Sequence, residues 1–426
     1  MTAPVELVLL GAGGRGTYAF GPYARMNPHR VRFVAVAEPI AERREAFARE
    51  HGIPSERCYA SWEELLAAGQ LAPGLINATM DRMHVPSTLA ALRIGYDVLL
   101  EKPMATTPED CMRLVQTAEQ YGRLLQICHV MRYTLFWGKI YEIVRSGRLG
   151  RILEVEHREN VSYWHMAHSF VRGNWRNSNG SSPMILAKCC HDMDILYWIL
   201  GVPVRRLSSF GRLSHFRADQ APAGAPLRCT DGCPAQEDCP WYAPRFYLND
   251  ATDSSMRGAL SRDQSMEARL KALREGPYGR CVYHCDNNVV DHQAITMELE
   301  DDTTILFSMQ GHSHIDARTM RYSGTRGTLR ASGDADEITI YDYLTGNEET
   351  VRPGHLMGGH GGGDTGVMNA YLDALQHPDQ MPLTSARASL ESHLMAFASE
   401  EARVTGAVLD MAAFRARIEQ AARQTV

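Results

Sequence analysis

The first 130 residues alternate between short apolar runs and longer stretches in which apolar residues recur at helical spacing. The apolar runs predict four buried strands, at Val5–Leu10, Arg32–Ala37, Gly74–Thr79 and Asp97–Leu100. The stretches between them predict four helices, at Thr17–Met26, Ile40–His51, Ser61–Ala68 and Val85–Ile94. Strands that alternate with helices of this length form βαβ units, and their right-handed crossovers give a parallel sheet. We therefore expect an α/β fold with a doubly wound parallel sheet in this part of the chain.

After Tyr133 the pattern changes, because strand-like runs now follow one another. A predicted helix at Phe136–Ser146 is followed by predicted strands at Ile152–Asn160, Gln293–Leu299, Thr303–Gln310 and Thr328–Ala331. Such a series indicates an open, largely antiparallel sheet. The chain then closes with predicted helices at Val367–Leu375, Ala386–Gly406 and Met411–Arg423.

The length of 426 residues exceeds what one hydrophobic core usually serves. We expect a first domain over residues 1–133 and a second α/β domain over residues 134–426, with C-terminal helices that pack back on the first. An insertion at 218–285, rich in proline, glycine, cysteine and charge, is expected to be a lid, an interface element or a flap held by a metal.

Composition narrows the range of partners. No uncharged run approaches the roughly 20 residues of a membrane span, and a net charge of −6 offers no basic field for nucleic acid or anionic lipid. The N-terminal apolar run lacks the preceding positive residues of a signal peptide. We therefore expect a soluble, cytoplasmic protein whose partner is a small molecule.

A glycine-rich turn joins the first predicted strand to the first predicted helix. It reads G-x-G-x-x-G, formed by Gly11, Gly13 and Gly16 with Gly14 and Arg15 between them. In a Rossmann domain such a turn brings backbone N–H groups close to a pyrophosphate, and a carboxylate about twenty residues later binds the adenosine ribose. Glu38 ends the second strand at that position and would repel a 2′-phosphate. NAD is therefore favoured over NADP, although Arg43 and Arg44 lie nearby; a purely structural turn is the alternative.

Further motifs strengthen this interpretation. Glu101, Lys102 and Pro103 follow a predicted strand and complete the pattern H-x10-G-x3-L-x-E-K-P that begins at His84. Together with the glycine turn and the later segment 191–194, this chain resembles the Gfo/Idh/MocA family of oxidoreductases. The resemblance implies that Lys102 lies beside the nicotinamide and the substrate hydroxyl, that His191 is the catalytic histidine, and that the protein is a homodimer or homotetramer. Thr79, His84 and Glu101 are then expected at the cofactor.

One position departs from the family pattern. Many members carry an aspartate four residues before the histidine, where this chain has Ala187. Lys188, about one helical turn before His191, is expected to face the site and polarise a substrate oxygen, unless it forms a structural ion pair. Asp192 or Asp194 would then orient the imidazole.

Aromatic residues mixed with hydrogen-bonding residues between 163 and 176 are typical of a sugar pocket, because rings stack on C–H faces while polar groups bind hydroxyls. An aromatic-rich core is the alternative. The expected substrate-binding residues are Arg132, Tyr133, Trp164, His165, His168, Arg172, Asn174, Trp175 and Asp192. The glycine-dense loop His355–Asp364 is expected to close over the substrate.

Five of the ten cysteines lie between 229 and 285, spaced C-x3-C-x5-C and then C-x3-C. Cys229, Cys233, Cys239 and Cys281, or Cys285 in place of the last, are expected to form a structural zinc site, with an iron–sulfur cluster or free thiols as alternatives.

Taken together, the residues and the resemblance predict an NAD-dependent oxidoreductase that transfers hydride between the cofactor and a hydroxyl of a sugar, inositol or sugar acid. Two alternatives stay open. One is a redox-assisted glycosidase or lyase that retains and recycles NAD; the other is a dinucleotide-binding module without chemistry.

Overall fold

The computed structural model describes residues 3–424, and its first sheet has six parallel strands in the order β3-β2-β1-β4-β5-β6. The strands are β1 (Val5–Leu10), β2 (Val31–Ala37), β3 (Cys58–Tyr59), β4 (Gly74–Asn77), β5 (Asp97–Leu100) and β6 (Leu125–Ile127). The helices are α1 (Gly21–Met26), α2 (Ala41–His51), α3 (Trp62–Ala67), α4 (His84–Arg93) and α5 (Pro108–Gln120). The predicted doubly wound parallel sheet is confirmed.

The second sheet has nine strands in the order β14-β13-β12-β11-β7-β10-β9-β8-β15. They are β7 (Ile152–Ser162), β8 (Val204–Arg212), β9 (His292–Leu299), β10 (Thr304–Ser313), β11 (Ala317–Gly324), β12 (Gly327–Ser332), β13 (Glu337–Asp342), β14 (Glu348–Val351) and β15 (Leu409–Asp410). Strands β7 and β10 pair in parallel, and the other neighbours pair antiparallel. The open, largely antiparallel sheet is confirmed. Ahead of β7 lies α6 (Leu135–Arg145), and between β7 and β8 lie α7 (Tyr163–His165), α8 (Met184–Ala187) and α9 (Cys190–Leu200).

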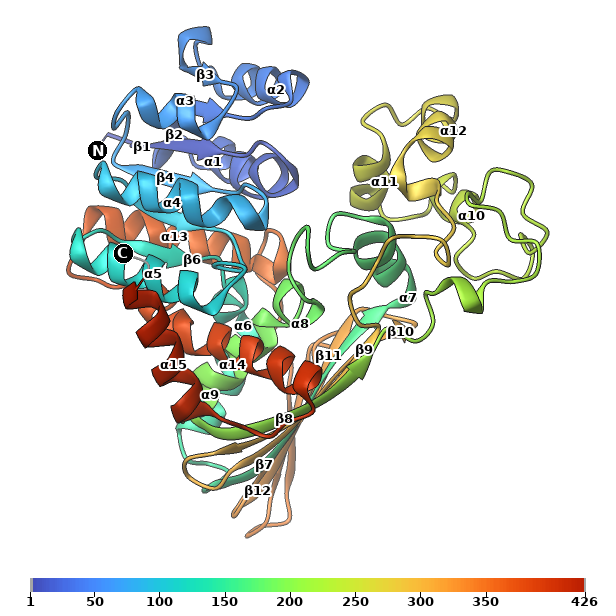
Figure 1. Cartoon of the computed structure of the whole chain (residues 1–426). Helices are drawn as coiled ribbons and strands as arrows, with labels where there is room; N and C mark the ends of the chain where they lie inside the picture. The colour runs from blue at the N-terminus through green and yellow to red at the C-terminus, as the bar shows by residue number, and fades with distance from the viewer. Residues whose placement is uncertain (1–2, 425–426) are drawn as a thin grey trace.

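The C-terminal helices contact both domains. Helix α13 (Gly363–Gln376) joins the apolar core of the first domain, and the hydroxyl of its Tyr371 donates to the carbonyl of Asp97 at 2.7 Å. Helices α14 (Ala386–Thr405) and α15 (Met411–Gln424) lie beside α5, and both also contact β8 (Figure 1). The end of the chain therefore ties the two sheets together.

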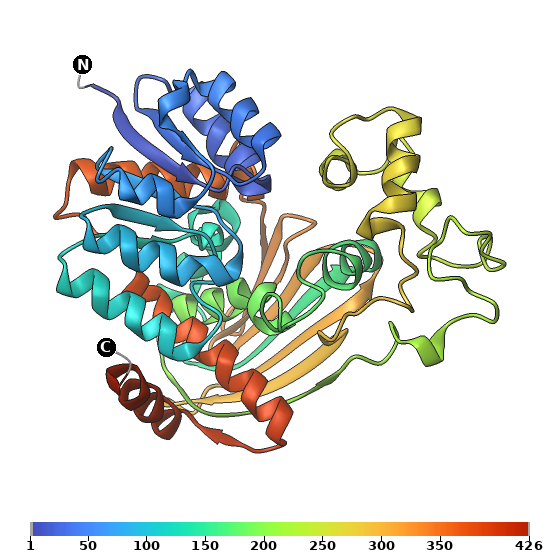
Figure 2. The ribbon, with the colours of Figure 1, turned by 45° about the horizontal axis from the view of Figure 1, so that its top comes forward.

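A long insertion between β8 and β9, residues 213–291, contains α10 (Ala243–Tyr247), α11 (Ser254–Leu260) and α12 (Met266–Glu275). In Figures 1 and 2 it projects beyond the second sheet, on the side where α1 and α2 of the first domain lie. An ion pair of 3.6 Å between Arg262 and Glu42 reaches across to α2. Among the helices of residues 3–424, none is both long and apolar enough to pass through a bilayer.

Candidate active site

The glycine turn after β1 is shaped by close backbone contacts. A Cβ on Gly11 would lie 2.5 Å from the carbonyl oxygen of Ala78, and one on Gly16 would lie 2.3 Å from that of Gly11. No heavy atom lies within 4 Å of a Cβ placed on Gly13 or Gly14, so this backbone is free to be approached by a ligand. The turn thus combines tight packing on one side with open space on the other, as a pyrophosphate requires.

Glu38 lies at the carboxyl end of β2, the strand next to the glycine turn. Its side chain is buried, and its carboxylate accepts a hydrogen bond from the backbone N–H of Ile40 at 3.0 Å. The guanidinium of Arg44 donates to the Glu38 carbonyl at 2.6 Å. Arg44 therefore fixes the backbone behind this carboxylate, and both groups fit the ribose side of a bound NAD.

The loop after β5 is held in place from two sides. His84 lies with one ring nitrogen 2.8 Å from the Pro103 carbonyl and the other 3.1 Å from the Thr79 carbonyl, so it joins the ends of β4 and β5. Arg15 bonds Glu101 at 2.6 Å and Asp364 at 2.7 Å. These contacts make His84 and the Arg15 side chain supports of the loop that carries Lys102, although both were expected at the cofactor itself.

The same arginine holds the glycine-dense loop. Burial alone would raise the pKa of Asp364, but hydrogen bonds from His360 and Arg15 bring it well below its usual range. Gly358, Gly361 and Gly362 have positive φ values here, and a Cβ on Gly362 would lie 2.3 Å from that of Leu356. His360 also contributes to lowering the pKa of His191, so this loop lies within electrostatic range of His191.

Lys102 and His191 belong to one site. The amine of Lys102 donates to the carbonyl of Ala187 at 3.2 Å, and Ala187 ends the short helix α8, directly before α9 with His191. Burial, followed by the charge of Lys102, lowers the pKa of His191 well below its ordinary value. Its Nδ1 has no hydrogen-bond partner within residues 3–424. The histidine is therefore a neutral imidazole with an unused nitrogen beside a lysine ammonium.

A buried row of charges runs inward from this site. The amine of Lys188 lies 3.2 Å from the carboxylate of Glu159 on β7, and Arg318 on β11 lies 2.7 Å from the same carboxylate. Arg318 also bonds Asp192 at 2.7 Å, and Asp192 accepts from the ring of His157 at 2.8 Å. Neither Glu159 nor Arg318 was indicated by the sequence.

A second buried group lies behind His191. The ring of His129, directly after β6, is 5.7 Å from that of His191 and 5.3 Å from that of His393 on α14. Burial lowers the pKa of all three imidazoles. Asp194, whose carboxylate lies 3.6 Å from His129, is bound by Arg132.

Three predicted substrate-binding residues are engaged inside the protein instead. Arg132 forms a bidentate pair with Asp194, at 2.8 and 2.7 Å, and donates to the Leu383 carbonyl. Asp192 is fully buried in the row described above. The hydroxyl of Tyr133 lies 3.2 Å from that of Thr384. Buried charges of this kind require paired partners, so Arg132 and Asp192 are held inside the protein. Substrate contact by these three residues stays a prediction.

Three more of the predicted substrate-binding residues lie in the segment after β7 and contact the insertion. Trp164 stacks on Phe246 at 3.8 Å between ring centroids, and His168 bonds the hydroxyl of Tyr247 at 2.6 Å. The fully buried Arg172 donates to the carbonyls of Arg280 and Trp241, at 2.8 and 2.7 Å. Their aromatic and polar character serves the packing of α10 and its neighbours, and their contact with a substrate stays a prediction.

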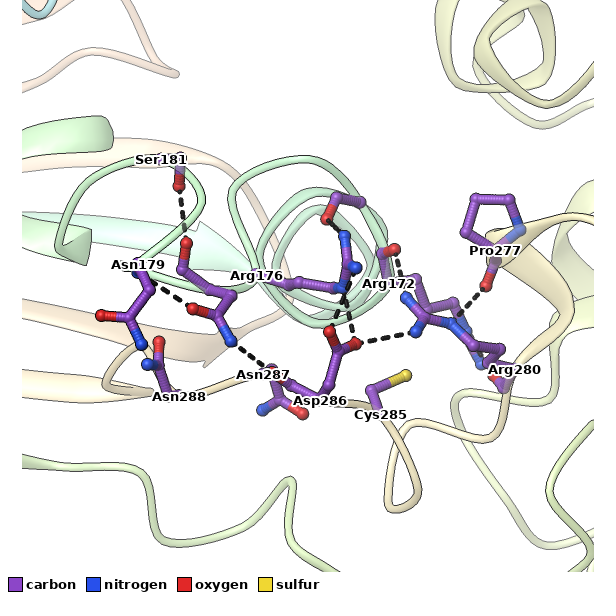
Figure 3. Close-up of polar contacts among 12 residues, drawn as sticks. Arg172, Arg176, Asn179, Ser181, Pro277, Arg280, Cys285, Asp286, Asn287 and Asn288 are labelled. Atoms are coloured by element: carbon purple, nitrogen blue, oxygen red, sulfur yellow. Dashed lines mark hydrogen bonds and ion pairs between the residues drawn. The ribbon is translucent and has the colours of Figure 1, made fainter. Parts of the chain in front are cut away.

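The returning end of the insertion is fixed at the same place. Figure 3 shows Arg176 and Arg280 converging on Asp286, at 2.7 and 2.8 Å, while Arg280 reaches back to the backbone carbonyl of Arg172. Hydrogen bonds, first from Arg176 and then from Arg280, lower the pKa of Asp286. The base of the insertion is therefore held by the ion pairs of Asp286 with Arg176 and Arg280.

The remaining predicted substrate-binding residues are His165, Asn174 and Trp175. His165 bonds Asp316 at 2.9 Å, and its pKa is lowered by burial and then by the charges of Lys188 and Lys102. The indole N–H of Trp175 donates to Asp81 of the first domain at 3.4 Å, while Asn174 beside it is exposed. The charges of both lysines therefore act on the imidazole of His165.

The cysteines of the insertion converge, but not as a metal centre. Cys229, Cys233, Cys239 and Cys281 line one small cavity with Trp241 and Tyr283. Burial raises the pKa of Cys239, and that of Cys281 to about 11. Within residues 3–424, no group of three or more His, Cys, Asp or Glu side chains is arranged to hold a metal ion. The predicted zinc site is therefore not supported.

Two family models match the chain in series. One, described as an oxidoreductase family with an NAD-binding Rossmann fold, matches residues 5–129. The other, described as the C-terminal alpha/beta domain of the same oxidoreductase family, matches residues 142–407. Together they cover both sheets.

Individual proteins show the same similarity. A putative oxidoreductase of Bacillus subtilis, YteT, is 24% identical over 68% of this chain and 69% of its own length. Inositol 2-dehydrogenase 2 of Saccharopolyspora erythraea is 33% identical over 30% of this chain and 34% of its own. An oxidoreductase from Agrobacterium radiobacter, solved with NAD+, L-tartaric acid and magnesium, superimposes with a TM-score of 0.69 at 14% identity, covering 96% of this chain and 99% of its own.

Proposed function

Because the chain belongs to the Gfo/Idh/MocA family of oxidoreductases, we propose that it uses NAD to oxidise or reduce a sugar, inositol or sugar acid at a carbon bearing a hydroxyl group. The observation that carries the proposal is the shared site of Lys102 and His191, connected through the bond from Lys102 to the Ala187 carbonyl. A lysine ammonium and a neutral imidazole are the two groups that alcohol oxidation needs, one to polarise the oxygen and one to take its proton.

The residues around the glycine turn fit NAD. The open backbone at Gly13 and Gly14 suits a pyrophosphate, and the buried carboxylate of Glu38 suits ribose hydroxyls while repelling a 2′-phosphate. When bound, NAD supplies the acceptor or donor of hydride. The protein must then position the substrate and manage its proton.

The chain's own side chains account for that proton. Lys102 donates a hydrogen bond to the substrate hydroxyl, which stabilises negative charge on the oxygen as its proton leaves. His191 takes the proton, because burial and the nearby Lys102 charge keep its imidazole neutral near pH 7. His165, on which the charges of both lysines act, binds a second substrate oxygen in this proposal.

The relatives reported above are named as oxidoreductases and a dehydrogenase, and these names give no support to a glycosidase with recycled NAD. One experiment separates the two functions. The purified protein is incubated with inositols, aldoses, sugar acids and aryl glycosides, each with NAD or NADP, while NADH and released aglycone are followed together. We expect NADH in proportion to the polyol oxidised, with NAD preferred. Release of aglycone without net NADH would contradict the proposal, as would the absence of turnover on every compound.

A further inference from the structure

Lysine is scarce in this chain. Only four of its 44 lysine and arginine residues are lysines, at 102, 139, 188 and 271, and two of these four belong to the candidate site. An ammonium differs from a guanidinium in being a compact charge with three donors that point in separate directions, whereas the donors of a guanidinium all lie in one plane. A lysine at 188 can therefore bond one carboxylate and keep donors for another ligand.

The geometry around Lys188 has this form. Its amine lies 3.2 Å from Glu159, and its side chain keeps 17% of its surface exposed, while the Glu159 side chain is almost completely enclosed. The Lys188 charge contributes to lowering the pKa of His165, so the amine acts on this imidazole as well as on the carboxylate. The enclosed carboxylate of Glu159 thus pairs with the amine of Lys188, which stays partly exposed.

Glu159 itself is fixed by the sheet. It lies directly opposite Arg318 in the antiparallel pairing of β7 with β11, and the two side chains meet at 2.7 Å. Because Arg318 also binds Asp192, the carboxylate of Glu159 is not fully neutralised by it and is available to Lys188. The titratable and charged groups that interact with this pair are His165, Cys189, Asp192, Asp316 and Arg318.

We propose that Glu159 is a positioning residue that holds the ammonium of Lys188 in the catalytic pocket, where Lys188 binds a substrate oxygen beside Lys102. This inference rests on the proposed function and adds to it a second lysine and the carboxylate that orients it. Ala187 has no carboxyl group, so the pair formed by Lys188 and Glu159 supplies the charged group on this side of the pocket.

The pair also predicts a pH dependence. Burial raises the pKa of Glu159 to about 7, with Arg318 and Lys188 acting in the opposite direction. Protonation of Glu159 below that pH removes the ion pair and releases Lys188. Burial lowers the pKa of His191 and His165, so neither imidazole accounts for an inflection near neutral pH.

The first test needs no substrate. Reductive methylation with 13C-formaldehyde labels the four lysines and the N-terminus, and the Lys188 signal is identified by its loss in Lys188→Met. In Glu159→Gln we expect the pKa of the Lys188 amine to fall by about one unit or more, because its buried counter-charge is gone. The matched control is Glu142→Gln, which removes the exposed partner of Lys139 at 2.7 Å and should leave the Lys188 signal unchanged. An unchanged Lys188 titration in Glu159→Gln would overturn the pairing.

The second test uses the best compound from the substrate panel. For Glu159→Gln we expect kcat/KM to fall 10- to 100-fold and its inflection near pH 7 to disappear, whereas Glu159→Asp should regain part of the rate. Lys188→Met should resemble Glu159→Gln, and thermal unfolding would show that each variant is folded. Turnover by the wild type with unchanged rates in Lys188→Met and Glu159→Gln would overturn this inference alone. No turnover by the wild type on any compound would instead contradict the proposed function, independently of the NMR result.

Discussion

At the residue scale, Lys102 is the side chain on which the proposed chemistry depends most. Its amine is held toward the site by the Ala187 carbonyl, and its charge contributes to keeping His191 neutral. For Lys102→Met we expect kcat to fall about 1,000-fold while NAD still binds, because one electrostatic donor at the reacting oxygen is typically worth two to three orders of magnitude. Initial rates and a fluorescence titration with NAD measure the two effects.

Lys271→Met is the matched control for this variant, since Lys271 is an exposed lysine on α12. It should keep the wild-type rate. Wild-type turnover by Lys102→Met would contradict the assigned role, and loss of NAD binding would instead show that Lys102 serves the cofactor alone.

The sequence could predict site residues whose neighbours in the chain define them. The glycine turn, Glu38 and Lys102 each follow a strand at a fixed spacing, and the resemblance added His191. The sequence could not show whether Arg132 binds substrate or forms an internal ion pair. Its partner Asp194 is 62 residues away, and an arginine side chain suits either role. Glu159 was missed for a related reason: an inward-facing carboxylate on β7 is recognisable only once Arg318 is paired opposite it.

At the element scale, Arg172 connects the segment after β7 to the insertion. It is fully buried and donates to the backbone carbonyls of Trp241 and Arg280. For Arg172→Met we expect a loss of about 3 kcal/mol, because buried carbonyls lose charge-assisted hydrogen bonds. Limited proteolysis should then cut within residues 213–291 sooner, and the Tm should fall.

The exposed Arg274 at the end of α12 provides the comparison for Arg172. Arg274→Met should change neither the cleavage pattern nor the Tm. If both variants resist protease as the wild type does, the insertion does not depend on Arg172.

The junction of β6, α9 and α14 contains three buried imidazoles, of His129, His191 and His393, whose pKa values lie below the ordinary value of about 6.5. Between the folded and the unfolded pKa values, the unfolded chain binds more protons than the folded one. The stability that depends on these neutral imidazoles should therefore be complete above about pH 6.5. The free energy of unfolding should decrease as the pH falls below that value.

Replacing one imidazole should reduce this acid sensitivity. For His129→Asn we expect the slope of unfolding free energy against pH, measured by urea denaturation between pH 4.5 and 7.5, to decrease by up to about 1.4 kcal/mol per pH unit. His377→Asn, at an exposed position after α13, should keep the wild-type slope. An unaltered slope in His129→Asn would show that His129 is not the group that resists protonation.

The elements themselves were predictable where apolar periodicity is strong. Strands β1, β2, β4 and β5 and helices α2 and α4 agree with their predicted positions to within a few residues. Strand β6 was missed because it has only three residues. Strand β11 was missed because its inward positions include Arg318, whose burial is made tolerable by the carboxylates of two other elements.

At the scale of the whole molecule, the C-terminal helices make the two domains interdependent. Tyr371 on α13 donates to the Asp97 carbonyl at the start of β5, while α14 contributes His393 to the imidazole group behind His191. No local pattern predicts such contacts, since they join segments separated by more than 250 residues. The catalytic loop of the first domain and the helix with His191 are thereby held in one framework.

The outer face of the second sheet is the surface at which we expect the chain to form a homodimer or homotetramer. Phe210 on β8 is 71% exposed and Leu306 on β10 is 41% exposed. Strand β9 lies between these two strands and pairs with each of them. A two-fold axis at this face would bring the same side chains of two copies together, so Phe210→Glu would place like charges opposite each other. Sedimentation velocity at micromolar concentration should show an oligomer for the wild type and a larger monomer fraction for Phe210→Glu.

Leu344→Glu, at an 85% exposed position beyond β13, should sediment as the wild type does. A monomeric wild type, or an oligomer unaffected by Phe210→Glu, would exclude this face as the interface.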